Sequence, residues 1–245
     1  MITWLSEIDS TNRYAAQRSA DAPEGSVWAA FTQTAGRGQQ HNSWESEPHK
    51  NLTFSLLLRP VWLPAEEQFY LSKAVSLGIT GFLRQHGLEP AIKWPNDVYA
   101  GDRKIAGILI ENQITGSGIG SSIVGIGLNV NQERFFSDAP NPTSIVLETG
   151  RTLDLQQALP ELTACILNRY ESLRAGDRPS LDADYHAQLY RCNQWHLFAT
   201  DATRFRARIV GVRPSGELLL EDEQRQTRAY LFKEVHFCLK ADETG

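Results

Sequence analysis

The chain has 245 residues, 41% of them hydrophobic, and a formal net charge of −5. That length suits one large domain or a large domain with a small second one, and the apolar share is enough for a core. No apolar run approaches the roughly 18 residues of a membrane span. The N-terminus lacks a signal-peptide pattern, and the acidic balance disfavours a nucleic-acid surface. We therefore expect a cytoplasmic protein that binds neither membrane nor DNA.

The first half of the chain alternates apolar runs with turn signals. A short helix is expected after Ser10 and Thr11, either of whose hydroxyls could cap it. Further along, the pattern predicts strands at 26–33 and 51–60, a helix at 65–87, two strands at 91–113 joined by a turn at 100–104, and a strand at 121–131. Gly125 and Gly127 in that last strand indicate a close approach to the backbone.

The second half changes texture near Arg191. Helical patterns cover 154–176, with Pro160 inside, and 180–192. Short β-like runs then fill 205–240, with turns at 213–217 and 221–226, as in a small barrel. We therefore place a domain boundary between 1–190 and 191–245. Cys165, Cys192 and Cys238 show neither metal nor disulfide spacing, which predicts reduced, buried thiols.

The stretch AGRGQQHNSWES, residues 35–46, is too polar for a core element. Gly36 and Gly38 let backbone N–H groups approach an anion, and Arg37 between them adds a positive fork suited to phosphate or carboxylate. Trp44 could close over an apolar or aromatic ligand. The alternative is a surface turn with a chance arginine. The spacing fits neither GxxxxGK[ST] nor GxGxxG, so a nucleotide would be held in neither of those ways.

A second polar stretch, KWPNDVYAGDRKIAGI, carries two lysines. Lys93 and Lys104 lie eleven residues apart across the expected hairpin, where they would form a phosphate cradle or remain two solvated lysines. Asp97 would hold a lysine, hold a metal ion or form a turn. Asn129 ends an apolar strand in GIGLNVN, where its amide would read a ligand or close a turn.

Taken together, DSTN, QTAGRG, KWPND, DRKIAGIL, GIGLNVN and TSI, in this order, resemble biotin protein ligases (biotin–[acetyl-CoA-carboxylase] ligases). The likeness runs along nearly the whole chain. It implies an α+β fold, with a mixed β-sheet flanked by helices as in the class II synthetase-like biotin/lipoate ligases, followed by a small C-terminal SH3-like β-barrel. Because DSTN begins at Asp9, we expect a short form without an N-terminal DNA-binding domain.

The resemblance also implies an activity. Biotin would be activated with ATP and Mg²⁺ as biotinyl-5′-AMP and transferred to one lysine of a biotin carboxyl carrier protein. By match to the family's motifs, biotin would be bound by Ser10, Thr11, Asn12, Gln33, Arg37, Gly38, Gln39 and Lys104. The nucleotide would be bound by Arg37, Trp44, Lys93 and Asn129, and catalysis would use Arg37, Lys104 and Lys93. No metal ligand is assigned to the protein.

Two departures and three alternatives accompany this reading. Gln39 stands where the family often has a second arginine, and His41 where it often has a glycine, so one cation is missing beside the adenylate. A lipoate or octanoate ligase of the same fold is an alternative, as are a ligase that doubles as a repressor and a non-catalytic biotin-binding module. Retention of Lys93 and Lys104 disfavours the last. The sequence leaves the oligomeric state open, a homodimer included.

Overall fold

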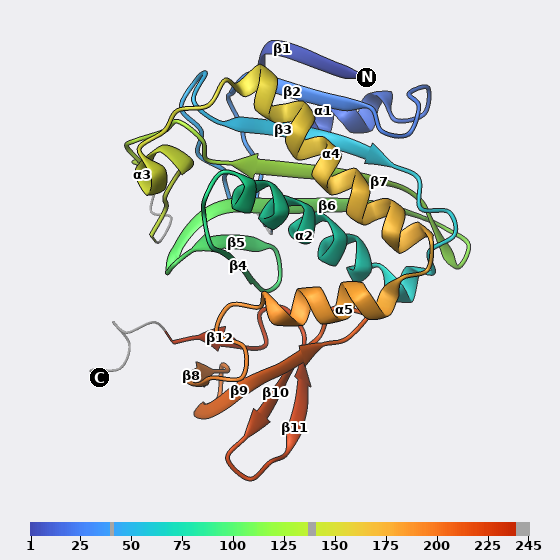
Figure 1. Cartoon of the computed structure of the whole chain (residues 1–245). Coiled ribbons are helices and arrows are strands. Elements are labelled where there is room, and N and C mark those ends of the chain that lie inside the picture. Colours follow the sequence, from blue (N-terminus) through green and yellow to red (C-terminus); the bar gives the residue numbers. More distant parts are fainter. Residues whose placement is uncertain (40–41, 137–140, 239–245) are drawn as a thin grey trace.

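The computed structural model describes residues 1–39, 42–136 and 141–238, and Gln40 and His41 of the polar loop lie outside them. Within those ranges the chain forms a seven-stranded sheet and a five-stranded one (Figure 1). The larger sheet has the order β1-β2-β3-β7-β6-β5-β4, and only the β1–β2 pair among the described strands is parallel. Its strands are β1 (Ile2–Ile8), β2 (Val27–Gln33), β3 (Leu52–Leu58), β4 (Pro90–Lys93), β5 (Asp97–Ala100), β6 (Arg103–Thr115) and β7 (Gly118–Leu128).

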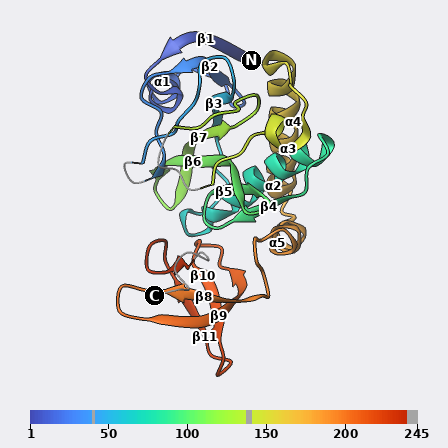
Figure 2. The same ribbon diagram turned by 90° about the vertical axis from the view of Figure 1, so that its left-hand side faces the viewer.

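Helices cover both faces of this sheet, which confirms the expected architecture of a mixed sheet flanked by helices. The helices are α1 (Thr11–Arg18), α2 (Phe69–Gln85), α3 (Ile145–Thr149), α4 (Leu155–Arg174) and α5 (Arg178–Ala187), with a short 3₁₀ turn, η2 (Ala65–Glu67). Figure 2 shows α1 on one side of the sheet and α2 and α4 on the other. Every residue of β3 is buried, because this central strand is covered from both sides.

The smaller sheet follows α5 and is antiparallel, in the order β11-β10-β9-β8-β12. Its strands are β8 (Trp195–Ala199), β9 (Arg204–Val212), β10 (Leu218–Asp222), β11 (Thr227–Tyr230) and β12 (His236–Phe237). It agrees with the small C-terminal β domain that we expected. The boundary near Arg191 would fall in the segment between α5 and β8 and stays a prediction.

Several element boundaries differ from the expectation. The range 91–113 forms parts of three strands, because the chain turns at residues 94–96 between β4 and β5. Strand β1 was not expected, since it owes its place to pairing with β2. The second of the two expected helices ends at Ala187 because the following residues pair with β4: Ile92 N donates to Gln188 O, and Tyr190 N donates to Ile92 O.

The two sheets are fastened together by buried polar contacts. The indole Nε1 of Trp94 donates to Gly216 O at 2.8 Å, from the turn before β5 to the turn before β10. Lys73 of α2 is almost fully buried, and its Nζ lies 2.6 Å from an Asp182 carboxylate oxygen and 3.3 Å from Val212 O. These contacts hold the smaller sheet beside β4, the strand at one edge of the larger sheet.

The expectation for the cysteines was partly right, and the expectation for the helix cap was wrong. All three cysteines are free thiols, but only Cys238 is buried, whereas Cys165 and Cys192 are half-buried. Ser10 occupies the N-cap position of α1 without any side-chain capping bond, so the capping role considered for Ser10 and Thr11 was wrong. No helix among the described residues is long and apolar enough to cross a membrane.

A matched pair of glycines in α2 tests the helix packing. A Cβ on Gly78 would lie 2.5 Å from the Ile166 Cα of α4, whereas one on Gly81 would have no atom within 4 Å. Gly78→Ala is expected to lower the free energy of unfolding by about 1–3 kcal/mol through overpacking. Gly81→Ala, the control, is expected to raise it by about 0.5–1 kcal/mol by removing a helix-interior glycine. Urea denaturation checks both, and equal stability of the two variants would contradict this packing.

Candidate active site

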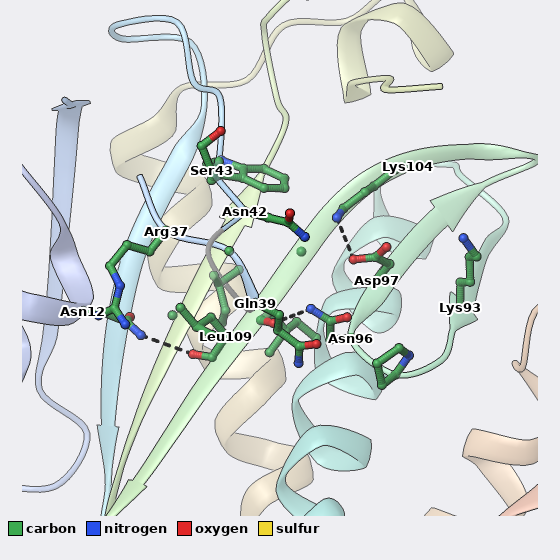
Figure 3. Close-up of a pocket in the computed structure, with 18 of the residues that line it drawn as sticks. Asn12, Arg37, Gln39, Asn42, Ser43, Lys93, Asn96, Asp97, Lys104 and Leu109 are labelled. Carbon is green, nitrogen blue, oxygen red and sulfur yellow. Dashed lines mark hydrogen bonds and ion pairs between the residues drawn. The ribbon is translucent and has the colours of Figure 1, made fainter. Parts of the chain in front are cut away.

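One cavity of about 310 Å³ lies between the larger sheet, the polar loop and the smaller sheet (Figure 3). Its size is at the lower end of the range for small-molecule sites, about 300–1,000 Å³. Ten of the expected site residues line it: Ser10, Thr11, Asn12, Gln33, Arg37, Gly38, Gln39, Trp44, Lys93 and Lys104. Residues that lie up to 94 positions apart in the sequence (Ser10 and Lys104) thus face one space.

Neutral hydrogen-bonding groups form one end of the cavity. The backbone N–H and the hydroxyl of Thr11 lie 2.9 and 3.2 Å from Gln33 Oε1. Ser55 Oγ, on β3, lies 2.9 Å from Thr11 Oγ1 and 2.6 Å from Asn12 Oδ1. Thr11, Asn12 and Ser55 are all buried, so this network is held rigidly. It can orient a neutral polar ligand group that both donates and accepts hydrogen bonds.

The polar loop folds back on itself beside this network. Gly38 N donates to Asn42 O at 2.7 Å, and Trp44 N donates to Gly36 O at 3.0 Å. A Cβ on Gly36 would lie only 2.4 Å from Trp44 O, so a glycine is needed there. Arg37 at the bend lies 2.9 Å from a Glu111 carboxylate oxygen. The loop therefore presents its arginine in a defined place, and the alternative of a chance arginine on an unstructured turn is disfavoured.

Trp44 lies flat against two glycines of neighbouring strands. A Cβ on Gly107 of β6 would be 2.9 Å from Trp44 Cζ3, and one on Gly127 of β7 would be 2.2 Å from Trp44 Cε2. Gly125 is equally tight, since a Cβ there would be 2.2 Å from Asn12 Oδ1. The close approach expected at Gly125 and Gly127 is confirmed. The tryptophan gives the cavity an aromatic wall, and its buried Nε1 has no hydrogen-bond partner within the described chain.

The cationic part of the cavity comes from the strands β4, β5 and β6. Lys104 Nζ lies 2.7 Å from Asp97 Oδ1 and 5.6 Å from the Trp44 ring centroid. Of the roles considered for Asp97, holding a lysine is thus the observed one. Lys93 Nζ donates to Tyr99 Oη at 3.0 Å, and burial lowers the pKa of this lysine below its ordinary value. A bound anion would restore the charge that burial disfavours.

The smaller sheet closes the far end of the cavity. The lining residues from this part of the chain are Phe232, Val235, His236 and Phe237. The ring of Phe237 has its centroid 5.6 Å from Lys93 Nζ. None of these residues was expected from the sequence, because their motif-free segment reaches the cavity only through the docking of the two sheets.

Two further residues qualify the sequence reading. Ser55 was missed, although a serine inside the otherwise apolar run TFSLLL was a signal in the sequence. Asn129 is not among the described residues that line the cavity. Its side chain is buried, with Nδ2 donating to Thr143 O at 2.9 Å and Oδ1 left without a hydrogen-bond partner. A role for Asn129 beside the nucleotide therefore stays a prediction.

The described residues contain no group of three or more His, Cys, Asp or Glu side chains arranged to hold a metal ion. The cavity instead has Arg37 beside the neutral group of Asn12 on one side and Lys104 and Lys93 on the other (Figure 3). Such a site suits an anionic ligand with a neutral polar head, in which phosphate groups would carry the metal ion themselves.

Comparison with known proteins places this fold and site in a family. The family model for the Biotin/lipoate A/B protein ligase family matches residues 4–131. The chain is 30% identical over 230 residues to the bifunctional ligase/repressor BirA of Bacillus spizizenii, covering 91% of this chain and 70% of that protein. It is 29% identical over 223 residues to the biotin–[acetyl-CoA-carboxylase] ligase of Paracoccus denitrificans, covering 88% of this chain and 92% of that one.

A solved structure shares the fold along almost the whole length. The biotin protein ligase from Aquifex aeolicus in complex with biotin and ATP superposes with a TM-score of 0.80 at 24% identity, covering 97% of this chain and 99% of that chain. The chain therefore belongs to the Biotin/lipoate A/B protein ligase family. This agrees with the resemblance seen in the motifs.

Proposed function

We propose that this chain is an ATP-dependent, AMP-forming ligase that activates biotin as biotinyl-5′-AMP and transfers the biotinyl group to a lysine of a biotin carboxyl carrier protein. One observation carries the proposal: Arg37, Lys104 and Lys93 line a single cavity whose other end is the neutral network around Thr11. The relatives named as biotin ligases support the choice of biotin. The carrier protein follows from the same relatives.

The site separates the parts of the substrates by their chemistry. The neutral ring of biotin suits the buried hydroxyls and amides of Thr11, Gln33 and Asn12, which offer both donors and acceptors. The carboxylate would then point toward Arg37 and Lys104. Trp44 and Lys93 line the same cavity and would border the nucleotide. Mg²⁺ would be held by the phosphates of ATP and would help to neutralise their charge.

The first step forms one bond and breaks another. A carboxylate oxygen of biotin attacks the α-phosphorus of ATP, the bond to the bridging oxygen breaks, and pyrophosphate leaves with that electron pair. Negative charge builds up on the phosphate oxygens, where Arg37 and Lys104 provide fixed positive charge. Asp97 holds the Lys104 amine in place for this task.

The second step uses the mixed anhydride. The neutral amine of the acceptor lysine attacks the biotinyl carbonyl carbon, AMP leaves, and the amine gives up a proton as the amide forms. Until the lysine arrives, water must be kept from the anhydride. The described residues 36–39 and 42–44, which fold back on each other beside the cavity and end in Trp44, would exclude it.

Intact mass spectrometry tests the proposal directly. The full chain is incubated with biotin, MgATP and a biotin-carrier domain, and the carrier is expected to gain one biotinyl group. Omission of ATP, or exchange of the acceptor lysine for arginine, serves as the control. Transfer of lipoate or octanoate in place of biotin would support the alternative ligase of this family. Biotin binding without biotin-dependent exchange of pyrophosphate into ATP would support a non-catalytic module.

Gln39 offers a test of how tightly the adenylate is held. It lines the cavity with a buried Oε1 that lacks a hydrogen-bond partner within the described chain. An arginine at this position would form charge-assisted bonds, roughly twice as strong as neutral ones. Gln39→Arg is therefore expected to slow the loss of biotinyl-5′-AMP about tenfold, equivalent to about 1.4 kcal/mol. The measurement is a chase of a preformed complex with unlabelled ligand, at fixed salt.

The opposite result is equally informative. An unchanged rate of loss would mean that neutral donors of the loop already hold the intermediate. Gln39→Lys adds the charge without the planar fork of an arginine and is the matched comparison. A gain with arginine but not with lysine would indicate that the geometry of the donors, rather than the charge alone, sets the rate.

A further inference from the structure

One carboxylate beside the cavity connects two residues that line it, Arg37 and Asn12. Glu111, on β6, has Oε1 2.9 Å from Arg37 Nη2 and Oε2 3.4 Å from Arg37 Nη1. The same Oε2 accepts a hydrogen bond from Asn12 Nδ2 at 2.8 Å. The guanidinium belongs to the polar loop and the amide to α1, so Glu111 bridges two elements that both contribute to the cavity lining.

The position of the Glu111 carboxylate is fixed from the side of α1. Asn12 Nδ2 also donates to Leu109 O at 3.3 Å, and Asn12 Oδ1 accepts from Ser55 Oγ at 2.6 Å. Gly125 leaves no room behind this amide for any side chain. The amide of Asn12 therefore has one orientation, with its N–H groups directed toward Glu111. This leaves the carboxylate facing Arg37.

The ion pair itself is half-exposed, since the side chains of Arg37 and Glu111 are 41% and 39% accessible. Ion pairs of this kind contribute little to stability and are easily exchanged. Arg37 nevertheless faces the space where an anionic ligand group would arrive. A ligand carboxylate that binds Arg37 meets a guanidinium already paired with Glu111, so the two carboxylates compete for it and repel each other.

We propose that Glu111 is a positioning residue that holds Arg37 at the cavity while no anion is bound and competes with the carboxylate of the ligand for it. The inference rests on the proposed function, which makes biotin the ligand. Glu111 thus keeps the arginine ordered and, at the same time, weakens the binding of free biotin. A neutral ligand of the same shape does not compete for the guanidinium, so its affinity does not depend on the charge of residue 111.

Calorimetric binding of two ligands to Glu111→Gln tests this. A glutamine keeps an acceptor for Asn12 and nearly the same shape, but it loses the charge. The dissociation constant of biotin is expected to fall about three- to fivefold, the size of one half-exposed ion pair. That of biotinamide, the neutral analogue, is expected to stay the same. Glu111→Asp, which keeps the charge, is expected to bind biotin within about twofold of the unchanged protein.

The control is Glu148→Gln, which removes a carboxylate that also pairs with an arginine at 2.8 Å, but this arginine, Arg103, does not line the cavity. It should alter neither dissociation constant. Equal shifts for biotin and biotinamide in Glu111→Gln would show a purely structural role and overturn the proposal. Weaker binding of biotin, but not of biotinamide, in Glu111→Gln would overturn it too. Arg37 would then need Glu111 in order to bind the ligand. An unchanged folded protein that binds neither ligand would instead contradict the proposed function.

Discussion

Replacing Lys104 with alanine is expected to slow biotin-dependent exchange of pyrophosphate into ATP about tenfold to hundredfold while leaving the fold intact. The variant would lose the charge-assisted hydrogen bond between Lys104 and the carboxyl–phosphate junction, which is worth roughly 1.5–3 kcal/mol. About 1.4 kcal/mol corresponds to each factor of ten in rate. Its partner Asp97, 2.7 Å away, would be left as an uncompensated anion facing the phosphates and would add to the loss.

A second variant separates these two contributions. Asp97→Asn in the Lys104→Ala background removes the uncompensated charge and is expected to restore part of the exchange rate. Arg103→Ala is the control, because Arg103 is the neighbouring cation, half-exposed and paired with Glu148 on the surface. It should exchange at the normal rate. A normal exchange rate in Lys104→Ala itself would contradict the proposed contact with the carboxyl–phosphate junction. Lys104 would then be a solvated surface lysine.

Replacing Gly127 with alanine is expected to push Trp44 off the sheet. The new Cβ would lie 2.2–2.6 Å from three atoms of the indole, so the ring must move or the strands must separate. Such overpacking costs about 1–3 kcal/mol of stability. Because Trp44 would border the nucleotide, the variant should also bind ATP more weakly, by about 1–3 kcal/mol if one base–aromatic contact is lost. Thermal unfolding and ATP titration measure the two effects separately.

Strand β7 offers its own control. A Cβ on Gly118 would be at ordinary contact distance, 3.5 Å from its nearest neighbour, so Gly118→Ala should change neither stability nor ATP binding. Combining Gly127→Ala with Trp44→Ala removes the clash and is expected to recover the stability but not the affinity for ATP. Recovery of both would mean that Trp44 does not contact the nucleotide.

The elements that the sequence predicts well are those whose pattern depends on local burial. Strand β3 is a continuous apolar run, and α2 and α4 repeat apolar residues at helical spacing. Strands β1 and β8 were missed because few of their residues are buried, and they exist by pairing with a partner strand. Tertiary pairing of this kind leaves little trace in a single segment.

The candidate site divides in the same way. Arg37 and Lys104 stand out in the sequence because glycines and turn residues surround them in polar stretches. Glu111 does not stand out, since its role depends on α1 and the polar loop meeting the end of a long strand. The residues of the smaller sheet, such as Phe237, lie far along the chain from any motif and reach the cavity only after the sheets dock. No local pattern encodes that docking.

The cavity wall that Phe237 completes has a consequence for folding during synthesis on the ribosome. The wall runs from Ser10 to Phe237, so 227 further residues must be made after Ser10 before the cavity can close. At about 5–20 residues per second, this takes on the order of ten to fifty seconds. Until Gly216 has left the ribosome, Trp94, which ends up buried, lacks the backbone acceptor of its indole N–H. A nascent chain would therefore expose this apolar edge of the larger sheet to chaperones, and the cavity would enclose a ligand only after Phe237 had been made.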